Sequence, residues 1–514
     1  MKRAMLLSAA AALAVAAGPA AGPSPASARE AALGRASCAD LQGRSFGSAR
    51  ILSAAAVEPH SDYRPEPGQR PVKVDAAFCR VKGAIETEIG FELWLPARTA
   101  WNGKFLGAGV GGDAGAFNFQ DLPRGVARGY AAGTTDTGHK ASDPAWMMGP
   151  PERLANYTHR ANHLLAESGK RILADYYGSP AKRSYFIGCS GGGRQALKEV
   201  QLYPDDYDGV IAGAPGPKTP EMTVRRMWEL IQREAQPGLL SPADWKRIAD
   251  EGVRQCDALD GVKDGVAEDP RQCRFNVRSL QCEPNQTTAC LTTEQAAFAA
   301  RFYAPLRDET GRALDEGILP GVLIDSGRSR LAPATFGQAV RHDPNWKGQD
   351  FSTRKDLDAI RRVMPELAAD HTDLSAFARH GGKLILYHGW MDPAVAARMT
   401  PAYREAVIRR MGPAQTKAFL RLFMVPGMGH CAGGPGADQL GGSGPDAPAL
   451  DADHDLLTAL EGWVEQNRAP EQLIASKLEQ GRVVRTHLLC AAPRHAQYDG
   501  RGSPDDAKSY SCVS

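Results

Sequence analysis

The chain carries almost no net charge and, after its N-terminus, no long apolar run. Lysine and arginine number 61 and aspartate and glutamate 59, which leaves a formal net charge of +2. So small a charge on 514 residues gives no reason to expect nucleic acid or an anionic membrane surface as a partner. No segment beyond the N-terminal one is apolar over the length that a bilayer requires, so we expect no stable membrane insertion.

The chain also lacks Cys-x-x-Cys pairs, internal repeats and low-complexity linkers, apart from a glycine- and proline-rich stretch at 432–448. Without a Cys-x-x-Cys pair, a metal site built from cysteines has no support. The ten cysteines are an even number, which in an exported chain predicts five disulfides. Sequence alone does not fix the pairing, but short separations favour Cys256–Cys273, Cys282–Cys290 and Cys490–Cys512.

The N-terminus predicts export. Two basic residues precede an alanine- and leucine-rich run at 4–17, and a Pro/Ser/Ala stretch ends in Ala26-Ser27-Ala28. This layout is typical of a secretory signal peptide cut after Ala28. The alternative, a single anchoring helix, needs a longer apolar run, and no cysteine before Cys38 is present to carry a lipid anchor. We therefore expect a signal peptide at 1–28 and a periplasmic or secreted protein.

Strands alternate with helices over the first half of the chain. After a β-rich approach ending at about residue 95, apolar and β-branched runs indicate strands, and a long helical pattern covers 151–177. Such alternation predicts a mostly parallel α/β sheet. The alternation stops between about 217 and 379 and then resumes; the expected strands are 104–109, 129–133, 184–189, 209–214, 383–388 and 419–425.

A glycine-rich corner follows the strand at 184–189. Gly188-Cys189-Ser190-Gly191-Gly192 is a G-x-S-x-G motif between a strand and the helical pattern that begins at Gln195. In such a corner a strained turn exposes the serine hydroxyl at the end of a sheet, and the glycines prevent backbone clashes. A plain glycine turn is the alternative in a chain with 54 glycines. The position between strand and helix favours Ser190 as a nucleophile.

An acid and a base follow the two later strands. Asp392 comes after the strand at 383–388 and His430 after the strand at 419–425. Serine, acid and histidine in this chain order, each in a loop after a strand, are typical of the α/β-hydrolase fold. A helix N-cap is the alternative role for Asp392, and a surface loop position is the alternative for His430. We expect Ser190, Asp392 and His430 to form a catalytic triad.

These strands predict an α/β-hydrolase domain in two parts, 29–216 and 380–514, with a large lid domain at 217–379 inserted in the second half of its sheet. Insertions over the carboxyl edge of such a sheet usually cover the active site. Cys189 precedes the serine and Cys431 follows the histidine. If bonded to each other rather than elsewhere, they would hold the nucleophile corner and the base loop together.

Other polar residues are alternative candidates. Asp136 and His139 form a possible acid/base pair, but they precede the nucleophile in the chain, so we interpret them as structural. His388 is interpreted as a packed residue at a strand end rather than as a base. Three carboxylates fall within 257–264, where glycines allow the chain to curl, and such a set suits a hard cation bound through oxygen. A solvated acidic turn is the alternative.

The chain resembles the bacterial and fungal tannase/feruloyl esterase family, which also contains the enzyme that hydrolyses mono(2-hydroxyethyl) terephthalate. The family's hallmark is a Cys-Ser, Asp, His-Cys arrangement with a disulfide between the two cysteines. The similarity covers nearly all of the mature chain, and its residues lie at 101–106, 135–139, 188–195, 388–393, 427–431 and 500–507.

The resemblance implies a set of disulfides and a structural Ca²⁺ site, with no organic cofactor. The implied disulfides are Cys38–Cys79, Cys189–Cys431, Cys256–Cys273, Cys282–Cys290 and Cys490–Cys512. The implied calcium ligands are the side chains of Asp257, Asp260 and Asp264 and the carbonyl groups of Val262 and Val266.

The oxyanion hole needs preorganised N–H donors. The amide of Gly191 is the first expected donor, and the loop at 109–112 should supply the second. The family often has asparagine or glycine where Val110 stands, so Gly111 and Gly112 both remain candidates.

The expected function is hydrolysis of a small-molecule aromatic ester by an exported serine esterase. The resemblance suggests feruloyl or other hydroxycinnamoyl, galloyl or terephthaloyl monoesters. The alternatives are a general carboxylesterase, a polyester-oligomer hydrolase and, less favoured because no triad member is lost, an inactive exported binding protein. We expect lid residues to line the substrate pocket: Trp228, Phe302, Tyr303, Phe336, Trp346, Arg225, Arg328 and Arg341.

Overall fold

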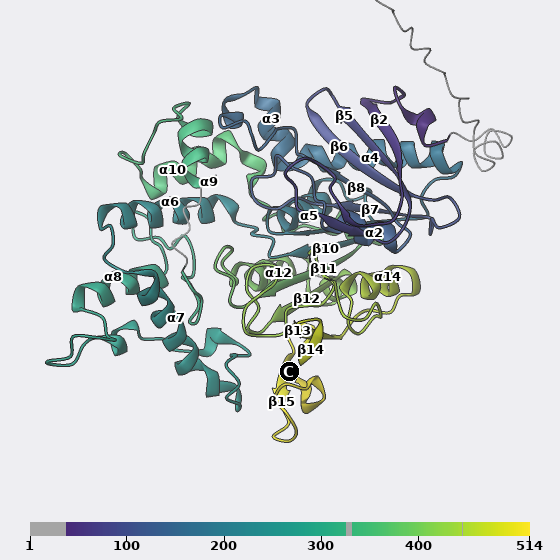
Figure 1. Ribbon diagram of the computed structural model, residues 1–514. Coiled ribbons are helices and arrows are strands. Elements are labelled where there is room, and N and C mark those ends of the chain that lie inside the picture. Colours follow the sequence, from purple (N-terminus) through teal and green to yellow (C-terminus); the bar gives the residue numbers. More distant parts are fainter. Residues whose placement is uncertain (1–36, 325–330, 445) are drawn as a thin grey trace, which may run out of the picture.

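The computed structural model describes residues 37–324, 331–444 and 446–514. The expected signal peptide at 1–28 therefore lies outside the described residues. Within them, ten strands form the main sheet, in the order β1-β2-β5-β6-β8-β7-β9-β10-β11-β12 (Figure 1). The strands are β1 Ser45–Phe46, β2 Ala49–Val57, β5 Phe78–Ile85, β6 Ile89–Pro96, β7 Lys104–Ala108, β8 Ala131–Thr135, β9 Arg183–Cys189, β10 Gly209–Gly213, β11 Lys383–Gly389 and β12 Leu420–Val425.

The sheet has a parallel and an antiparallel half. Six neighbouring strands, β8, β7, β9, β10, β11 and β12, pair in parallel. The strands β1, β2, β5, β6 and β8 pair in an antiparallel series. The parallel strands are buried on both faces, which explains why their sequences are continuous apolar runs. The β-rich approach expected before residue 95 thus adds strands to the main sheet itself.

Helices cover both faces of the sheet. Helices α4 Ala161–Tyr177, α5 Gly191–Leu202 and α12 Met399–Met411 pack in one apolar cluster. Helices α2 Asp121–Ala127 and α14 Leu456–Gln466 pack in the cluster on the other face. The result is the three-layer arrangement expected of a parallel α/β sheet.

The helix expected at 151–177 is interrupted. It consists of α3 Pro151–Ala155, a π-helical turn at Asn156–Arg160 and then α4. A π turn changes the backbone hydrogen-bond pattern and often occurs at functional sites. Here the carbonyl groups of Tyr157 and Thr158 accept hydrogen bonds from the buried guanidinium of Arg194 on α5, at 3.2 and 2.9 Å. The turn therefore joins this helix to the helix that follows the serine.

The segment between β10 and β11 is helical and contains no strand among its described residues. It lies beside the sheet in Figure 1, where α6 to α10 form a separate group. Leu374 and Phe377, near the end of the segment, belong to the same apolar cluster as Leu384 of β11 in the sheet domain. The helices are α6 Thr219–Ala235, α7 Pro242–Cys256, α8 Thr293–Tyr303, α9 Leu331–Ala334, α10 Thr353–Val363 and α11 Ser375–His380.

The C-terminal part adds two small hairpins. Strands β13 Gln472–Glu479 and β14 Arg482–Cys490 form one hairpin, and β15 His495–Tyr498 pairs with β16 Tyr510–Val513. They project from the sheet domain in Figure 1.

All ten cysteines are paired in the five combinations that the resemblance implies. So many disulfides indicate a protein that folds in an oxidising compartment.

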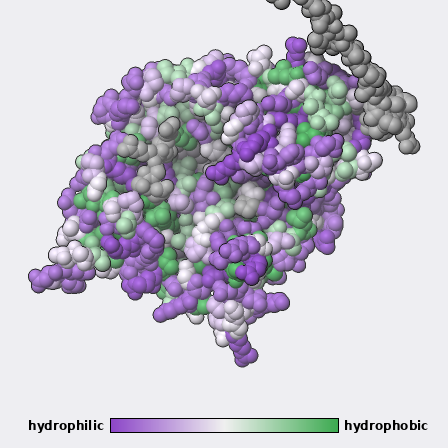
Figure 2. Space-filling view, viewed as in Figure 1, coloured by the Kyte–Doolittle hydropathy of each residue, from purple (hydrophilic) through white to green (hydrophobic). Residues whose placement is uncertain are grey.

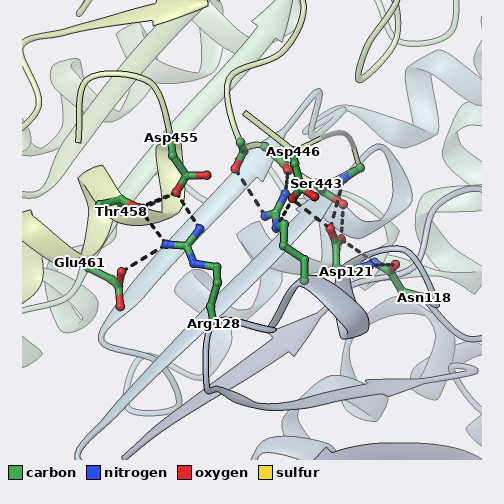
Figure 3. A network of polar contacts seen from close by, with 12 residues as sticks. Asn118, Asp121, Arg128, Ser443, Asp446, Asp455, Thr458 and Glu461 are labelled. Atoms are coloured by element: carbon green, nitrogen blue, oxygen red, sulfur yellow. Dashed lines mark hydrogen bonds and ion pairs between the residues drawn. The ribbon is translucent and has the colours of Figure 1, made fainter. Parts of the chain in front are cut away.

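The long loop after β12 is anchored to α2 by a buried polar network (Figure 3). Asp121 accepts hydrogen bonds from Asn118 and from the hydroxyl of Ser443, and Arg124 donates to the carbonyl of Gly442 at 2.6 Å. Farther along, Arg128 contacts α14 and the residue that caps it: its partners are Asp455, Thr458 and Glu461. These bonds fix the chain that follows His430 to the body of the domain.

The visible surface is mostly hydrophilic, with apolar residues in small separate groups (Figure 2). Over the described residues, none of the helices combines the length and the apolar character that crossing a membrane requires.

Candidate active site

Ser190 occupies a strained corner between β9 and α5. Its backbone has φ 61° and ψ −124°, a region that residues with a side chain rarely adopt. Its N–H donates to the carbonyl of Gly213 at 3.0 Å, and its own carbonyl accepts from Arg194 N–H at 2.9 Å. The neighbouring strand and the new helix therefore hold the strained conformation expected of a nucleophile corner.

The two motif glycines are required by close backbone contacts. A Cβ atom on Gly188 would lie 2.4 Å from the carbonyl oxygen of Gly192. A Cβ atom on Gly192 would lie 2.9 Å from the carbonyl carbon of Gly109. Backbone atoms cannot yield as a flexible side chain does, so the glycines permit the corner rather than merely marking a turn.

Asp392 and His430 lie in the turns after β11 and β12. The His430 Nδ1 atom is 2.7 Å from Asp392 Oδ2, while Asp392 Oδ1 accepts the N–H groups of Ala394 and Val395 at 2.7 and 2.9 Å. Nδ1 must donate to the carboxylate, which leaves Nε2 as a proton acceptor. Burial raises the pKa of Asp392, but hydrogen bonds from His388 and His430 outweigh it, so the pKa lies well below its ordinary value.

The disulfide Cys189–Cys431 joins the serine corner to the base loop. Its Cα atoms are 6.0 Å apart, and each cysteine is the chain neighbour of a predicted triad member. Strands β9 and β12 are separated in the sheet by β10 and β11, so His430 needs a loop that reaches across two strands to approach Ser190. The disulfide holds the turn that carries His430 close to the corner that carries Ser190.

The predicted oxyanion residues also lie together. A Cβ atom on Gly191 would be 2.6 Å from the oxygen and 3.1 Å from the nitrogen of Gly112, so these two backbones touch. Gly112 also lines the same cavity as Ser190 and Gly191, and Gly111 does not. As the first residue of α5, Gly191 has an N–H group without an intrahelical acceptor.

Gln195 holds this loop, which sequence reasoning missed. Its buried amide accepts from the Val110 N–H at 3.0 Å and donates to the Val110 carbonyl at 3.1 Å. Asn162 donates to the same Gln195 oxygen at 2.9 Å. Helix α5, which follows the nucleophile, is thus hydrogen-bonded to the loop residue that precedes Gly111 and Gly112. A glutamine one turn into the helix of the motif was the only sequence signal for this contact.

A cavity of about 780 Å³ opens above Ser190. The sheet domain supplies its floor, including Gly112, Ser190 and Gly191, and the lid supplies much of its wall. The lid side chains in its lining include Met222, Arg226, Leu230, Arg233, Trp245 and Phe298, together with the carboxylates of Glu229 and Glu234.

The lid residues expected at this wall were wrongly chosen. Phe302, Phe336 and Trp346 pack inside the lid's own apolar clusters, and Trp228 and Tyr303 lie at their margin. Arg225 forms buried ion pairs with Glu229 and Asp315, and Arg341 pairs with Asp356. Arg328 lies outside the described residues. Other aromatic and cationic side chains of the lid line the cavity instead.

Asp136 and His139 form structural contacts, as expected. Asp136 accepts from the Gly90 and Gly138 N–H groups, each at 2.9 Å, and pairs with Lys140. His139 stacks on Trp146 with ring centres 3.7 Å apart, and burial lowers its pKa to about 4.

The acidic segment surrounds a small space. Asp260, Val262, Asp264 and Val266, four of the five expected calcium ligands, line one narrow cavity. The Asp257 carboxylate accepts the N–H groups of Asp264 and Gly265, at 3.1 and 2.9 Å. Across the described part of the chain, no three acidic, histidine or cysteine side chains converge as a metal cluster.

Comparison with known proteins places these features in one family. The family described as tannase and feruloyl esterase matches residues 72–329 and 336–513. An uncharacterized esterase from Xanthomonas campestris is 36% identical, over 93% of this chain and 91% of its own. A probable feruloyl esterase B-1 from Aspergillus terreus is 33% identical, over 88% of this chain and 89% of its own.

A solved structure agrees with these relatives. Feruloyl esterase B from Aspergillus oryzae superposes with a TM-score of 0.87 at 27% identity, covering 93% of this chain and 99% of its own. Because the family match spans most of the described residues and relatives above 30% identity cover nearly the whole chain, the protein belongs to the tannase and feruloyl esterase family and is a carboxylic ester hydrolase of the α/β-hydrolase fold.

Proposed function

We propose that the protein is an exported serine esterase that hydrolyses esters of aromatic acids through Ser190, His430 and Asp392. The observation that carries the proposal is the His430–Asp392 hydrogen bond of 2.7 Å, joined by the Cys189–Cys431 disulfide to the strained serine corner. The buried carboxylate fixes the histidine tautomer whose Nε2 can accept a proton.

The proposed reaction has two steps at the serine. His430 takes the Ser190 proton as the hydroxyl attacks the ester carbonyl, and it returns the proton to the leaving alcohol. Water activated by His430 then hydrolyses the acyl-enzyme. The N–H groups of Gly191 and Gly112 are assigned to the developing oxyanion, since their backbones touch and both line the cavity. Gly112 is favoured over Gly111 because Gly111 is not part of that lining.

The cavity supports an aromatic acyl group. Trp245 and Phe298 reach the cavity wall from the lid's own apolar cluster and are only 3% and 4% exposed, and Arg233 lies over the Trp245 ring at 5.0 Å from its centre. Aromatic rings bind such walls through stacking and edge contacts. Feruloyl or other hydroxycinnamoyl, galloyl and terephthaloyl monoesters all carry the aromatic ring that this wall would contact.

A panel of esters tests the substrate class. We expect the mature protein to hydrolyse at least one of methyl ferulate, methyl caffeate, methyl gallate and mono(2-hydroxyethyl) terephthalate with a higher kcat/KM than p-nitrophenyl acetate. Trp245→Ala should lower kcat/KM for that aromatic ester by roughly 10-fold or more, from the loss of one aromatic contact and its apolar area. Cleavage of p-nitrophenyl acetate alone would keep the mechanism and reject the aromatic acid.

We also propose a structural Ca²⁺ at the acidic segment. The donors are hard oxygen ligands, as calcium prefers, and two of the carboxylates face a space that two backbone segments share. Asp257, Asp260 and Asp264 would hold the ion with the carbonyl groups of Val262 and Val266. Bound calcium would tie the end of α7 to the loop closed by Cys256–Cys273. No catalytic step involves it.

Removal of calcium should lower stability rather than chemistry. A ligand present at 100 times its Kd stabilises the native state by about 2.7 kcal/mol, so chelation with EGTA should lower Tm by several degrees. Calcium added back should restore it and magnesium should not. Asp260→Asn should abolish the response, and the same Tm with and without EGTA in the calcium-loaded protein would reject the site.

A further inference from the structure

We propose that His388 is a positioning residue of the esterase site. Its side chain is a neutral imidazole that holds the Asp392 carboxylate in place, and the Thr400 hydroxyl fixes the orientation of that imidazole. This proposal rests on the proposed roles of Asp392 and His430. Sequence patterns predict only a packed residue at a strand end, and His388 is indeed fully buried in β11. Both of its ring nitrogens nevertheless meet polar atoms, and one of those atoms belongs to the acid of the triad.

The contacts form a chain from α12 to the base. His388 Nδ1 is 2.7 Å from the hydroxyl oxygen of Thr400, and His388 Nε2 is 3.0 Å from Asp392 Oδ2. The same Oδ2 atom is 2.7 Å from His430 Nδ1. Two imidazoles therefore share one carboxylate oxygen, one on the sheet side and one on the side of the serine.

The partners determine the tautomer of His388. Nε2 faces two acceptors, Asp392 Oδ2 and the Val395 carbonyl at 3.2 Å, so it must carry the hydrogen. Nδ1 can then accept the hydroxyl hydrogen of Thr400. In the protonated form both nitrogens would donate, and the Thr400 hydroxyl hydrogen would have no other partner among the described residues. The neutral form gives every hydrogen an acceptor.

This arrangement saturates Asp392. Its Oδ1 accepts from the Ala394 and Val395 N–H groups, and its Oδ2 accepts from the two histidines. A carboxylate with four donors cannot rotate without losing several hydrogen bonds. The His388 N–H also stabilises part of the negative charge on the Asp392 oxygen that contacts His430. Without that N–H, the carboxylate would direct more of its negative charge towards His430 and would stabilise the protonated imidazole more strongly.

The surrounding charges stay constant when only His388 changes. Arg225, Arg226 and Glu229 of α6, together with Arg398 before α12, face Asp392 across a small cavity. Both α6 arginines pair with Glu229, and Arg226 also donates to the carbonyl of Ala394 at 2.8 Å. A change in the pH profile of a His388 variant would thus report on Asp392 and His430 themselves.

The kinetic test compares His388→Leu with His388→Gln on an ester that the wild type hydrolyses. The leucine variant should lower kcat/KM by roughly 10- to 100-fold, the worth of a hydrogen bond to a charged group, mainly through kcat. The acid limb of its pH–rate profile should move to higher pH. Glutamine places an N–H near the position of the imidazole Nε2–H, so it should restore most of the activity and the wild-type limb. Equal losses in both variants, with an unchanged limb, would overturn the proposal.

A second measurement does not depend on these variants folding. In ¹⁵N-histidine-labelled Ser190→Ala protein at neutral pH, His388 should show the neutral tautomer with hydrogen on Nε2. An imidazolium signal, or hydrogen on Nδ1, would overturn the proposal. A wild type inactive on every ester would instead reject the proposed function, while the histidine signals would still decide the state of His388.

Discussion

Replacing Ser190 by alanine should reduce kcat for ester hydrolysis by about 10⁶-fold, as loss of the nucleophile does in serine hydrolases with a complete triad. The hydroxyl is the atom that would form the acyl bond, and the oxyanion donors and the cavity cannot replace it. Steady-state kinetics on the best ester of the panel, with single-turnover measurements for the variant, would determine the loss. Because alanine removes one oxygen beside an open cavity, Tm should change little.

Ser184→Ala provides the matched control. Ser184 lies on the same strand, β9, and is buried, but it is remote from the corner and does not line the cavity. Its variant should keep wild-type kcat. Ser190→Ala protein that still hydrolyses the ester at a rate near that of the wild type would refute the nucleophile. Equal losses in both variants would show that the change acted through folding rather than through chemistry.

The residues of the proposed triad could be selected from the sequence because their signals are local. Ser190, Asp392 and His430 each follow a strand of mostly apolar residues, and such strands are conspicuous because parallel strands are buried on both faces. The carboxyl ends of these strands meet at one edge of the sheet. Chain order then limits which polar residues can meet there.

The substrate wall could not be chosen in the same way. Arg225 and Arg226 are adjacent on α6, yet a helix turns about 100° per residue, so they face different surroundings. Arg225 pairs with Asp315 inside the lid and does not line the cavity at Ser190, whereas Arg226 does. Both faces of α6 carry buried residues, so its hydrophobic pattern does not indicate which face lies towards the serine.

The sequence also did not predict side-chain contacts between segments that are distant in the chain. Gln195 grips the backbone of Val110, which lies 85 residues earlier, and His388 reaches Thr400 on the next helix. Neither pair has a repeating pattern that sequence reading could detect. The π turn at Asn156–Arg160 is similar, because its residues keep a helical spacing while the hydrogen bonds change.

Removal of the Cys189–Cys431 disulfide should greatly lower the stability of the protein. Removing it with Cys189→Ala and Cys431→Ala should lower the free energy of unfolding by about 5 kcal/mol in the chain-entropy view, because it closes a long loop. The sequence separation of the pair is 242 residues, the largest of the five. Denaturant unfolding of the double variant, compared with the wild type, would measure the loss.

The same variant should also lose activity while it is folded. Strand order leaves β10 and β11 between the strands that carry Ser190 and His430, so without the covalent bond the base loop is held only by noncovalent contacts. A displacement of about 1 Å in a reacting group can cost about 100-fold in rate, so we expect kcat to fall by that order well below Tm. Removing Cys490–Cys512, which joins the C-terminal hairpins, should lower stability but leave kcat unchanged. If the Cys189–Cys431 variant keeps wild-type kcat while folded, the noncovalent contacts of the His430 loop are sufficient to position the base, and the disulfide serves stability alone.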